Sequence, residues 1–350
     1  MQEAIRSDKM LTIEALEAKL NKNELDSLYL FYGEEIFLLE SAVKKIKKLF
    51  GELVQGINYI MIDENNIKEL ISDIETPAFG FEKKLIMIRN SGILKKEGKR
   101  KDANLAQIKE EVNKYIADHM DVIKECNILI FIEEEVEKLK LYKTIDKNGC
   151  VCEFNMQKPL QIGKRLKAIC NAYHVKIADQ TIMYLIEECG SNMQNLIQEI
   201  RKLIEYVGTE GTIQKEDVDK LCTKQIQAVI FDLTDNLGKK NVAGALEVLN
   251  GLLFQKEPIQ KIFITLYNHF KKLYFVTLAQ KEKKDIATAL KLKPNQMFLV
   301  GKYKNQASFF EAKELRKLLE ELENLDANYK IGIIDLNLGL ESILCRYCSK

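Results

Sequence analysis

The sequence predicts an α/β domain, with a parallel sheet covered by helices on both faces, followed by a small helical domain and an all-α C-terminal bundle. Over the first part of the chain, short apolar runs alternate with segments whose apolar residues recur at helical spacing, as in βαβ units. Beyond Pro159 the strand-like runs stop. The 350 residues are enough for two or three domains at roughly 150 residues each.

Five runs in the N-terminal part are rich in β-branched and aromatic residues, which are typical of buried strands. They span residues 28–32, 58–62, 85–89, 127–132 and 151–154. Helical patterns between them predict helices at 35–50, 67–75, 105–120 and 136–147. This alternation predicts one α/β domain over residues 1–157.

The remaining sequence is helical in period. Apolar stripes predict amphipathic helices at 162–173 and 193–207, which we assign to a small helical domain of residues 158–223. From residue 226 onward the pattern stays helical, with a leucine stripe at 315–325 and a buried helix at 333–347. Residues 224–350 are therefore predicted to form a helical bundle.

Charge and cysteine usage restrict the class of protein. The 53 Lys and Arg residues against 52 Asp and Glu give a formal net charge of +1, so any nucleic-acid contact must come from a local patch. The first residues carry no apolar signal-like segment, and no apolar run is long enough to cross a bilayer. Eight scattered cysteines fit reduced thiols in a cytosolic protein.

The turn after the first predicted strand holds Gly33, Glu34 and Glu35 and leads directly into a helix. A phosphate cradle there needs several glycines, a lysine for the phosphates and a Ser or Thr for Mg²⁺. Here one glycine precedes two acids, and the chain contains no Gly-Lys-Ser/Thr. The apolar run ending in Glu133 and Glu134 mimics a Walker B strand, but without a cradle we predict a buried strand followed by a solvated acidic loop.

Two loops are candidates for contacts with a partner. Residues 75–84 place Phe79 and Phe81 on either side of Gly80, and such a pair either enters a pocket of a partner or packs against its own sheet. A second, basic loop either contacts phosphates or is only a solvated surface, and it lacks aromatic residues for base stacking. Its basic residues are Lys95, Lys96, Lys99, Arg100 and Lys101.

Metal-ligand and nucleophile patterns are weak. Cys345 and Cys348 form a lone CxxC pair without a second pair or a nearby histidine. The three histidines, His119, His174 and His269, are far apart in the sequence. We therefore predict no metal site, no cofactor and no catalytic site.

The order and spacing of these features resemble the delta subunit of the bacterial DNA polymerase III clamp loader. The resemblance spans essentially the whole chain and is carried by residues 28–35 with the following helix, 76–85, 190–203 and 329–345. It implies an AAA+-like N-terminal domain that has lost its ATP site, a helical lid domain and a C-terminal collar that assembles into a heteropentamer. Gln194 stands where active AAA+ proteins have a nucleotide-contacting arginine, so Gly33, Glu34, Glu35 and Gln194 would form a degenerate, non-functional nucleotide site.

The resemblance also implies a function. The family binds and opens the sliding clamp (the beta subunit), so that the clamp can be loaded on primed DNA, and works with gamma/tau ATPase subunits and delta prime in the bacterial cytoplasm. By position, Phe79 matches the family's clamp-contacting phenylalanine and Ala78 stands where leucine is often found. The resemblance implies that Phe81 compensates for the apolar surface that Ala78 lacks. Residues Pro77, Ala78, Phe79, Gly80 and Phe81 are the expected clamp-binding segment.

Two other functions remain open at this point. The chain could be a catalytically inert helical or AAA+-like scaffold of another assembly, or a divergent AAA+ ATPase. The missing phosphate cradle argues against the ATPase. Affinity for a clamp would separate the clamp-loader function from the scaffold.

Overall fold

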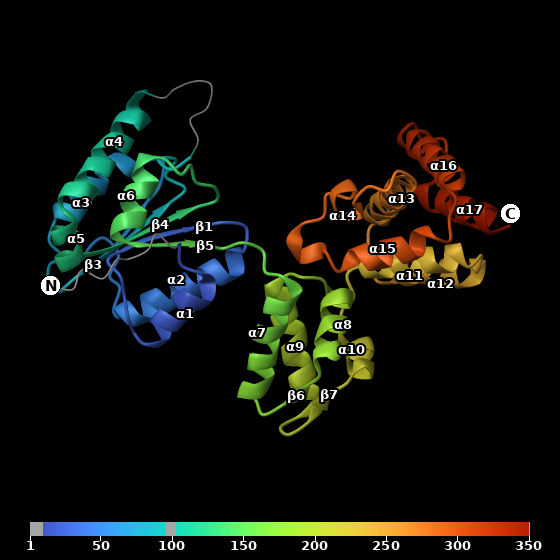
Figure 1. The fold of residues 1–350 in the computed structure, drawn as a ribbon, viewed down its shortest axis with the longest axis horizontal. Coiled ribbons are helices and arrows are strands. Elements are labelled where there is room, and N and C mark those ends of the chain that lie inside the picture. The colour runs from blue at the N-terminus through green and yellow to red at the C-terminus, as the bar shows by residue number, and fades with distance from the viewer. Residues whose placement is uncertain (1–9, 96–102, 350) are drawn as a thin grey trace. The chain divides into compact units, whose positions relative to one another are not determined.

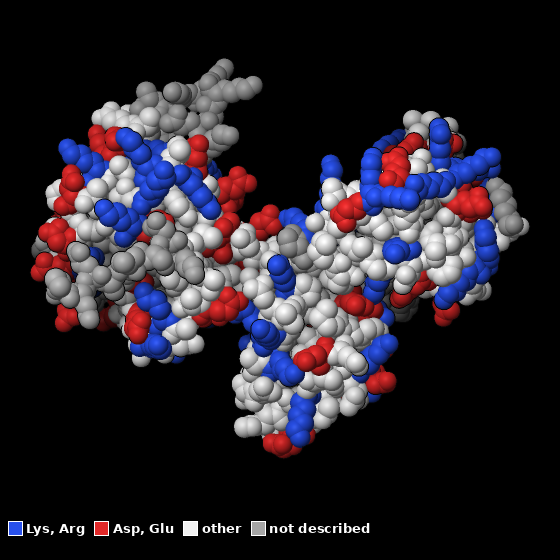
Figure 2. All heavy atoms as spheres, in the orientation of Figure 1, with Lys and Arg blue, Asp and Glu red and all other residues white. Residues whose placement is uncertain are grey.

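The computed structural model describes residues 10–95 and 103–349, and the chain divides into two compact units, Met1–Met156 and Gln157–Lys350. Each unit has a hydrophobic core of its own. Within the described residues, no helix combines the length and the apolar composition that crossing a bilayer requires. On the face shown in Figure 2, acidic and basic side chains are interspersed over both units.

The described part of the first unit is built on a five-stranded sheet in the order β2-β3-β4-β1-β5, in which every pair is parallel (Figure 1). The strands are β1 (Leu28–Tyr32), β2 (Tyr59–Ile62), β3 (Lys84–Arg89), β4 (Asn127–Glu133) and β5 (Cys150–Glu153). Every residue of β1 and β4 is buried, as expected for a parallel sheet covered on both faces. The five predicted strands are confirmed.

Helices cover both faces of this sheet, with α1 and α2 on one side and α4 and α6 on the other in Figure 1. They are α1 (Ile13–Asn21), α2 (Ile36–Phe50), α3 (Leu70–Glu75), α4 (Ala103–Asp118), α5 (Met120–Cys126) and α6 (Lys140–Asn148). Alternate residues of a strand point to opposite faces. Leu30 of β1 therefore joins the core formed with α3 to α6, while the neighbouring Phe31 packs against Phe154 with ring centroids 5.3 Å apart.

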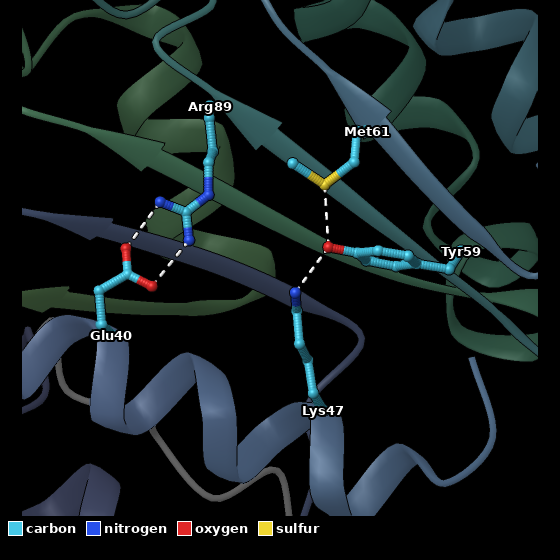
Figure 3. A network of polar contacts seen from close by, with 5 residues as sticks. All are labelled: Glu40, Lys47, Tyr59, Met61 and Arg89. Carbon is cyan, nitrogen blue, oxygen red and sulfur yellow. Dashed lines mark hydrogen bonds and ion pairs between the residues drawn. The ribbon is translucent and has the colours of Figure 1, made fainter. Parts of the chain in front are cut away.

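Polar contacts fasten α2 to the β2–β3 edge of the sheet (Figure 3). Arg89 at the end of β3 donates two hydrogen bonds, of 2.6 and 3.0 Å, to the carboxylate of Glu40 on α2. Two turns further along the same face of α2, the Lys47 ammonium donates to the Tyr59 hydroxyl at 2.6 Å. The Arg89 guanidinium holds the pKa of Glu40 below its usual value, although partial exposure keeps the contribution of such a pair small.

The second unit begins with four helices and a short two-stranded parallel ladder. These are α7 (Pro159–Ala172), β6 (Lys176–Ile177), α8 (Asp179–Cys189), α9 (Met193–Val207), β7 (Thr212–Ile213) and α10 (Lys215–Leu221). Asn192 caps α9 by accepting a hydrogen bond from the Asn195 amide at 3.0 Å. The two amphipathic helices predicted here are present as α7 and α9.

The rest of the second unit is helical and shares one large core, which draws its buried residues from Ile230 to Leu344. Its helices are α11 (Ile226–Gly238), α12 (Val242–Phe254), α13 (Ile259–Lys281), α14 (Ile286–Ala289), α15 (Leu299–Ala307), α16 (Ala312–Lys330) and α17 (Leu336–Cys348). Pro258 is the N-cap of α13, and Pro294 begins a short 3-10 turn. The predicted fold class is confirmed, while the three-domain division 1–157, 158–223 and 224–350 stays a prediction.

Candidate functional site

A tight turn links the end of α3 to the start of β3. The Phe81 amide donates to the Ala78 carbonyl oxygen at 2.9 Å, which closes a four-residue turn. Gly80, the third residue of that turn, has φ +83°, the conformation that a type II turn requires and that glycine adopts without strain. This geometry places Phe79 at the second position of the turn.

The apolar side chains of this turn differ in exposure. The side chain of Phe79 is 76% exposed, more than any other large apolar side chain described in the first unit. Phe81 and Ala78 are half-buried, and Pro77 is exposed. Of the two alternatives that the sequence left open, packing against the parent sheet does not apply to Phe79. The turn therefore offers one exposed aromatic ring, flanked by a second that is partly covered.

The base of the turn is held by a buried lysine. Lys84, the first residue of β3, is 2% exposed, and its ammonium donates to the carbonyl oxygens of Asp73 and Thr76 at 2.6 and 2.5 Å. Asp73 lies in the last turn of α3 and Thr76 is the C-cap residue, so neither carbonyl oxygen has a backbone partner within the helix. Burial lowers the pKa of Lys84, and the nearby Asp73 partly offsets this. Lys84 thereby ties the helix end before the turn to the strand after it.

A second contact fixes the same helix end to the sheet. The side-chain amide of Asn127, the first residue of β4, donates to the Ile74 carbonyl oxygen at 3.1 Å. Neither Asn127 nor Lys84 was among the residues predicted to matter. In the sequence Lys84 is one member of a Lys-Lys pair next to a loop, and no local signal shows that it alone is buried.

We expect Lys84→Met to lower the free energy of unfolding by about 2 kcal/mol, because two carbonyl groups lose their donor. Each such loss costs roughly 1–3 kcal/mol for a buried group, and the low end applies here because Thr76 is exposed and Asp73 is half-buried. The matched control is Lys83→Met, since Lys83 is half-buried and, among the described residues, donates a single hydrogen bond, to the Lys124 carbonyl oxygen at 2.7 Å. Urea unfolding followed by circular dichroism measures both. Equal effects of the two substitutions would contradict the role assigned to Lys84.

The predicted degenerate nucleotide turn is filled by the chain's own backbone. Gly33 has φ +123°, and a Cβ atom at this position would lie 2.5 Å from the Phe154 carbonyl oxygen. The Glu35 amide donates to that same oxygen at 2.8 Å. Glu35 is buried and Glu34 is exposed. Glycine is therefore needed here for close backbone approach between the end of β1 and the residue after β5.

Glu133 ends β4, where a Walker B strand would place a metal-directed acid. It is 2% exposed, and one of its carboxylate oxygens accepts hydrogen bonds from the Ser91 amide and hydroxyl at 3.0 and 2.7 Å. Burial raises the pKa of Glu133, while the bonds from Ser91 lower it. In this chain the carboxylate holds the segment that follows β3. The predicted solvated acidic loop thus begins only after Glu133, at the exposed Glu134.

The other predicted site residues lie elsewhere. Gln194 is exposed in the first turn of α9, in the second unit. Lys95 of the basic loop is exposed, and its other members, Lys96, Lys99, Arg100 and Lys101, lie outside the described residues. Cys345 and Cys348 are partly buried in α17.

Comparison with known families gives two matches that together span most of the chain. Residues 29–155 match the model of the DNA polymerase III, delta subunit, and residues 227–347 match that of the DNA polymerase III delta subunit, C-terminal domain. The turn at Phe79 and the strands around it lie inside the first match.

Individual proteins give the same assignment over nearly full length. The chain is 25% identical over 334 residues to the DNA polymerase III subunit delta of Bacillus subtilis, covering 93% of this chain and 94% of that protein. It is 25% identical over 324 residues to a probable DNA polymerase III subunit delta of Aquifex aeolicus, covering 89% and 88%. The solved structure of the Bacillus subtilis DNA clamp loader delta protein superimposes with a TM-score of 0.70 at 23% identity, covering 97% of this chain and all of that one.

Proposed function

The chain belongs to the DNA polymerase III delta subunit family, and from this we propose that it binds the sliding clamp and biases one clamp interface open, without hydrolysing ATP itself. The observation that carries the proposal is the ring of Phe79, 76% exposed on a turn that Lys84 holds at its base. An exposed aromatic ring in a fixed position is the kind of residue that dominates protein interfaces.

The proposed mechanism is a shift of population. The subunit can favour an open clamp only by binding it more tightly than the closed clamp. Burying one aromatic side chain contributes roughly 1.5–3 kcal/mol. The five residues Pro77–Phe81 form the proposed contact. Ala78 supplies less apolar contact surface than a leucine would, and we propose that Phe81 supplies part of the difference.

ATP would be handled by other subunits. The turn at Gly33 is occupied by the Phe154 backbone and carries two acids, and Gln194 has no positive charge to offer a nucleotide. Gamma/tau ATPase subunits and delta prime are the proposed partners, with the bundle of residues 224–350 as the collar. Primed DNA would be contacted in the assembled loader, in the bacterial cytoplasm, through backbone phosphates.

A titration of the purified full chain against the sliding clamp of the same organism tests this function, together with a titration against ATP. We expect saturable clamp binding and no ATP binding. ATP binding by the isolated chain would favour the divergent ATPase. A folded chain that neither binds the clamp nor assembles with the ATPase subunits would favour the inert scaffold of another assembly.

A further inference from the structure

Two cysteines and a glutamate from three different segments of the second unit meet at one point. Cys189 is the last residue of α8, Glu199 lies in α9, and Cys222 directly follows α10. The two sulfur atoms and a carboxylate oxygen all lie within 4.8 Å of one another. Cys189 is 2% exposed, the Glu199 side chain is 12% exposed, and Cys222 is half-buried. We propose that these three side chains bind one Zn²⁺ ion.

The donor set fits zinc. Two thiolates and a carboxylate suit a borderline-soft ion that accepts sulfur and oxygen ligands in tetrahedral geometry. With Zn–S bonds of about 2.3 Å and Zn–O bonds of about 2.1 Å, tetrahedral ligand atoms lie roughly 3.5–3.8 Å apart. The observed separations are at most 4.8 Å, so any that exceeds this geometry would have to shorten by no more than about 1.3 Å. The fourth position would be open to water.

The surroundings of the three ligands balance the charge of such a site. Two thiolates, one carboxylate and Zn²⁺ sum to −1, and the Lys202 ammonium lies 2.6 Å from the Glu199 carboxylate. Lys202 also donates to the Leu221 carbonyl oxygen at 3.3 Å, next to Cys222. The Thr223 amide donates to Glu199 at 3.3 Å. Contacts of this kind orient the ligands before an ion arrives, which favours binding.

The three proposed ligands lie next to the segment that connects α10 to α11. Two residues after Cys222, Lys224 forms an ion pair of 2.7 Å with Glu188, and the next amide, of Gln225, donates to the Glu188 carbonyl oxygen at 2.8 Å. This segment leads directly into α11. A bound ion would therefore link the end of α8, the middle of α9 and the segment that enters the C-terminal bundle, and would stabilise the second unit by its binding free energy.

The test uses the reduced, chelator-treated full chain and Co²⁺ as a spectroscopic probe, with Zn²⁺ as competitor. We expect one Co²⁺ per chain, with the sulfur-to-cobalt charge-transfer band and the intense visible bands of tetrahedral coordination, both lost on adding Zn²⁺. Cys222→Ser should weaken binding at least tenfold, and Cys189→Ser/Cys222→Ser should abolish it. The matched control is Cys345→Ser/Cys348→Ser, which should leave one ion bound.

Circular dichroism shows whether each variant is folded, and Cys222→Ser is the safer substitution because Cys222 is only half-buried. As a second readout, Zn²⁺ should raise the melting temperature of the wild-type chain and not that of Cys222→Ser. The proposal is wrong if the reduced chain shows no thiolate band, or if the band survives in Cys189→Ser/Cys222→Ser. A Cys189–Cys222 disulfide formed by dissolved oxygen, with no ion bound after reduction, would also overturn it and identify a redox pair instead.

Discussion

Phe79→Ala is expected to weaken binding of the sliding clamp roughly 10- to 100-fold, since burial of one aromatic ring contributes about 1.5–3 kcal/mol and each 1.4 kcal/mol is a factor of ten. The ring is 76% exposed in the free chain, so removing it costs the fold little. A loss of affinity without a loss of stability would therefore come from the interface itself.

The chain offers a matched control in Phe254, the last residue of α12, which is 90% exposed in the second unit. Phe254→Ala removes as much apolar surface from a residue with no assigned role in clamp binding, and we expect no change in affinity. Calorimetric titration of clamp into each variant, with circular dichroism as the check on folding, measures both. Wild-type affinity in Phe79→Ala would move the clamp contact away from this turn.

The strands of the sheet were easier to predict from the sequence than the short helices. Parallel strands are buried on both faces, so the five strands appear as continuous apolar runs and were predicted nearly to the residue. The short helix α5 was not predicted, because it buries only Ile123 and so has no apolar stripe; α1 was also missed, although Ile13, Leu16 and Leu20 are buried at helical spacing. Local pattern therefore sufficed where burial is uniform along an element.

The site depends more on tertiary contacts. The sequence Phe79-Gly80-Phe81 indicated a turn with two aromatic residues. Whether the Phe79 ring is exposed or packed depends on the direction that the backbone takes at Gly80, which only the structure shows. Lys84 holds this turn through carbonyls of α3, and no sequence pattern distinguishes it from Lys83. Cys189 and Cys222 are 33 residues apart, and their proximity results from the packing of α8, α9 and α10 rather than from any motif spacing.

His269 in α13 gives the chain a pH-dependent element in the core of the C-terminal bundle. It is 1% exposed, with Nε2 2.7 Å from the Gln306 side-chain oxygen and Nδ1 3.1 Å from the Gln227 side-chain nitrogen. A neutral ring that donates from Nε2 and accepts at Nδ1 satisfies both contacts. The pKa of His269 is lowered to about 4, chiefly by burial and also by the positive charge of Lys272, one turn along α13, while the hydrogen bond with Gln306 opposes this shift.

Stability of the second unit is therefore expected to fall as pH decreases from about 6.5, the ordinary histidine value, to about 4. The unfolded chain binds a proton in this range while the folded chain does not. The contribution of the neutral His269 to the free energy of unfolding is therefore fully present above about pH 6.5 and is lost progressively as the pH falls to about 4. Since a pKa difference of one corresponds to 1.36 kcal/mol, the difference of about 2.5 between the unfolded and folded chain corresponds to a loss of roughly 3 kcal/mol in the free energy of unfolding.

His269→Gln keeps hydrogen-bonding groups in the core but does not titrate. Between pH 7.5 and pH 4, the free energy of unfolding of this variant should fall by about 3 kcal/mol less than that of the wild type. Urea unfolding at a series of pH values, compared variant by variant, isolates this difference. The control is His174→Asn, because His174 is exposed at φ +56° and asparagine tolerates that conformation. If His269→Gln retained the full wild-type dependence on pH, other groups would carry it. The carboxylates whose pKa burial raises, Asp73, Glu133 and Asp232, would not be among them, because they bind protons more readily in the folded chain and so stabilise it as the pH falls, which is the opposite sign.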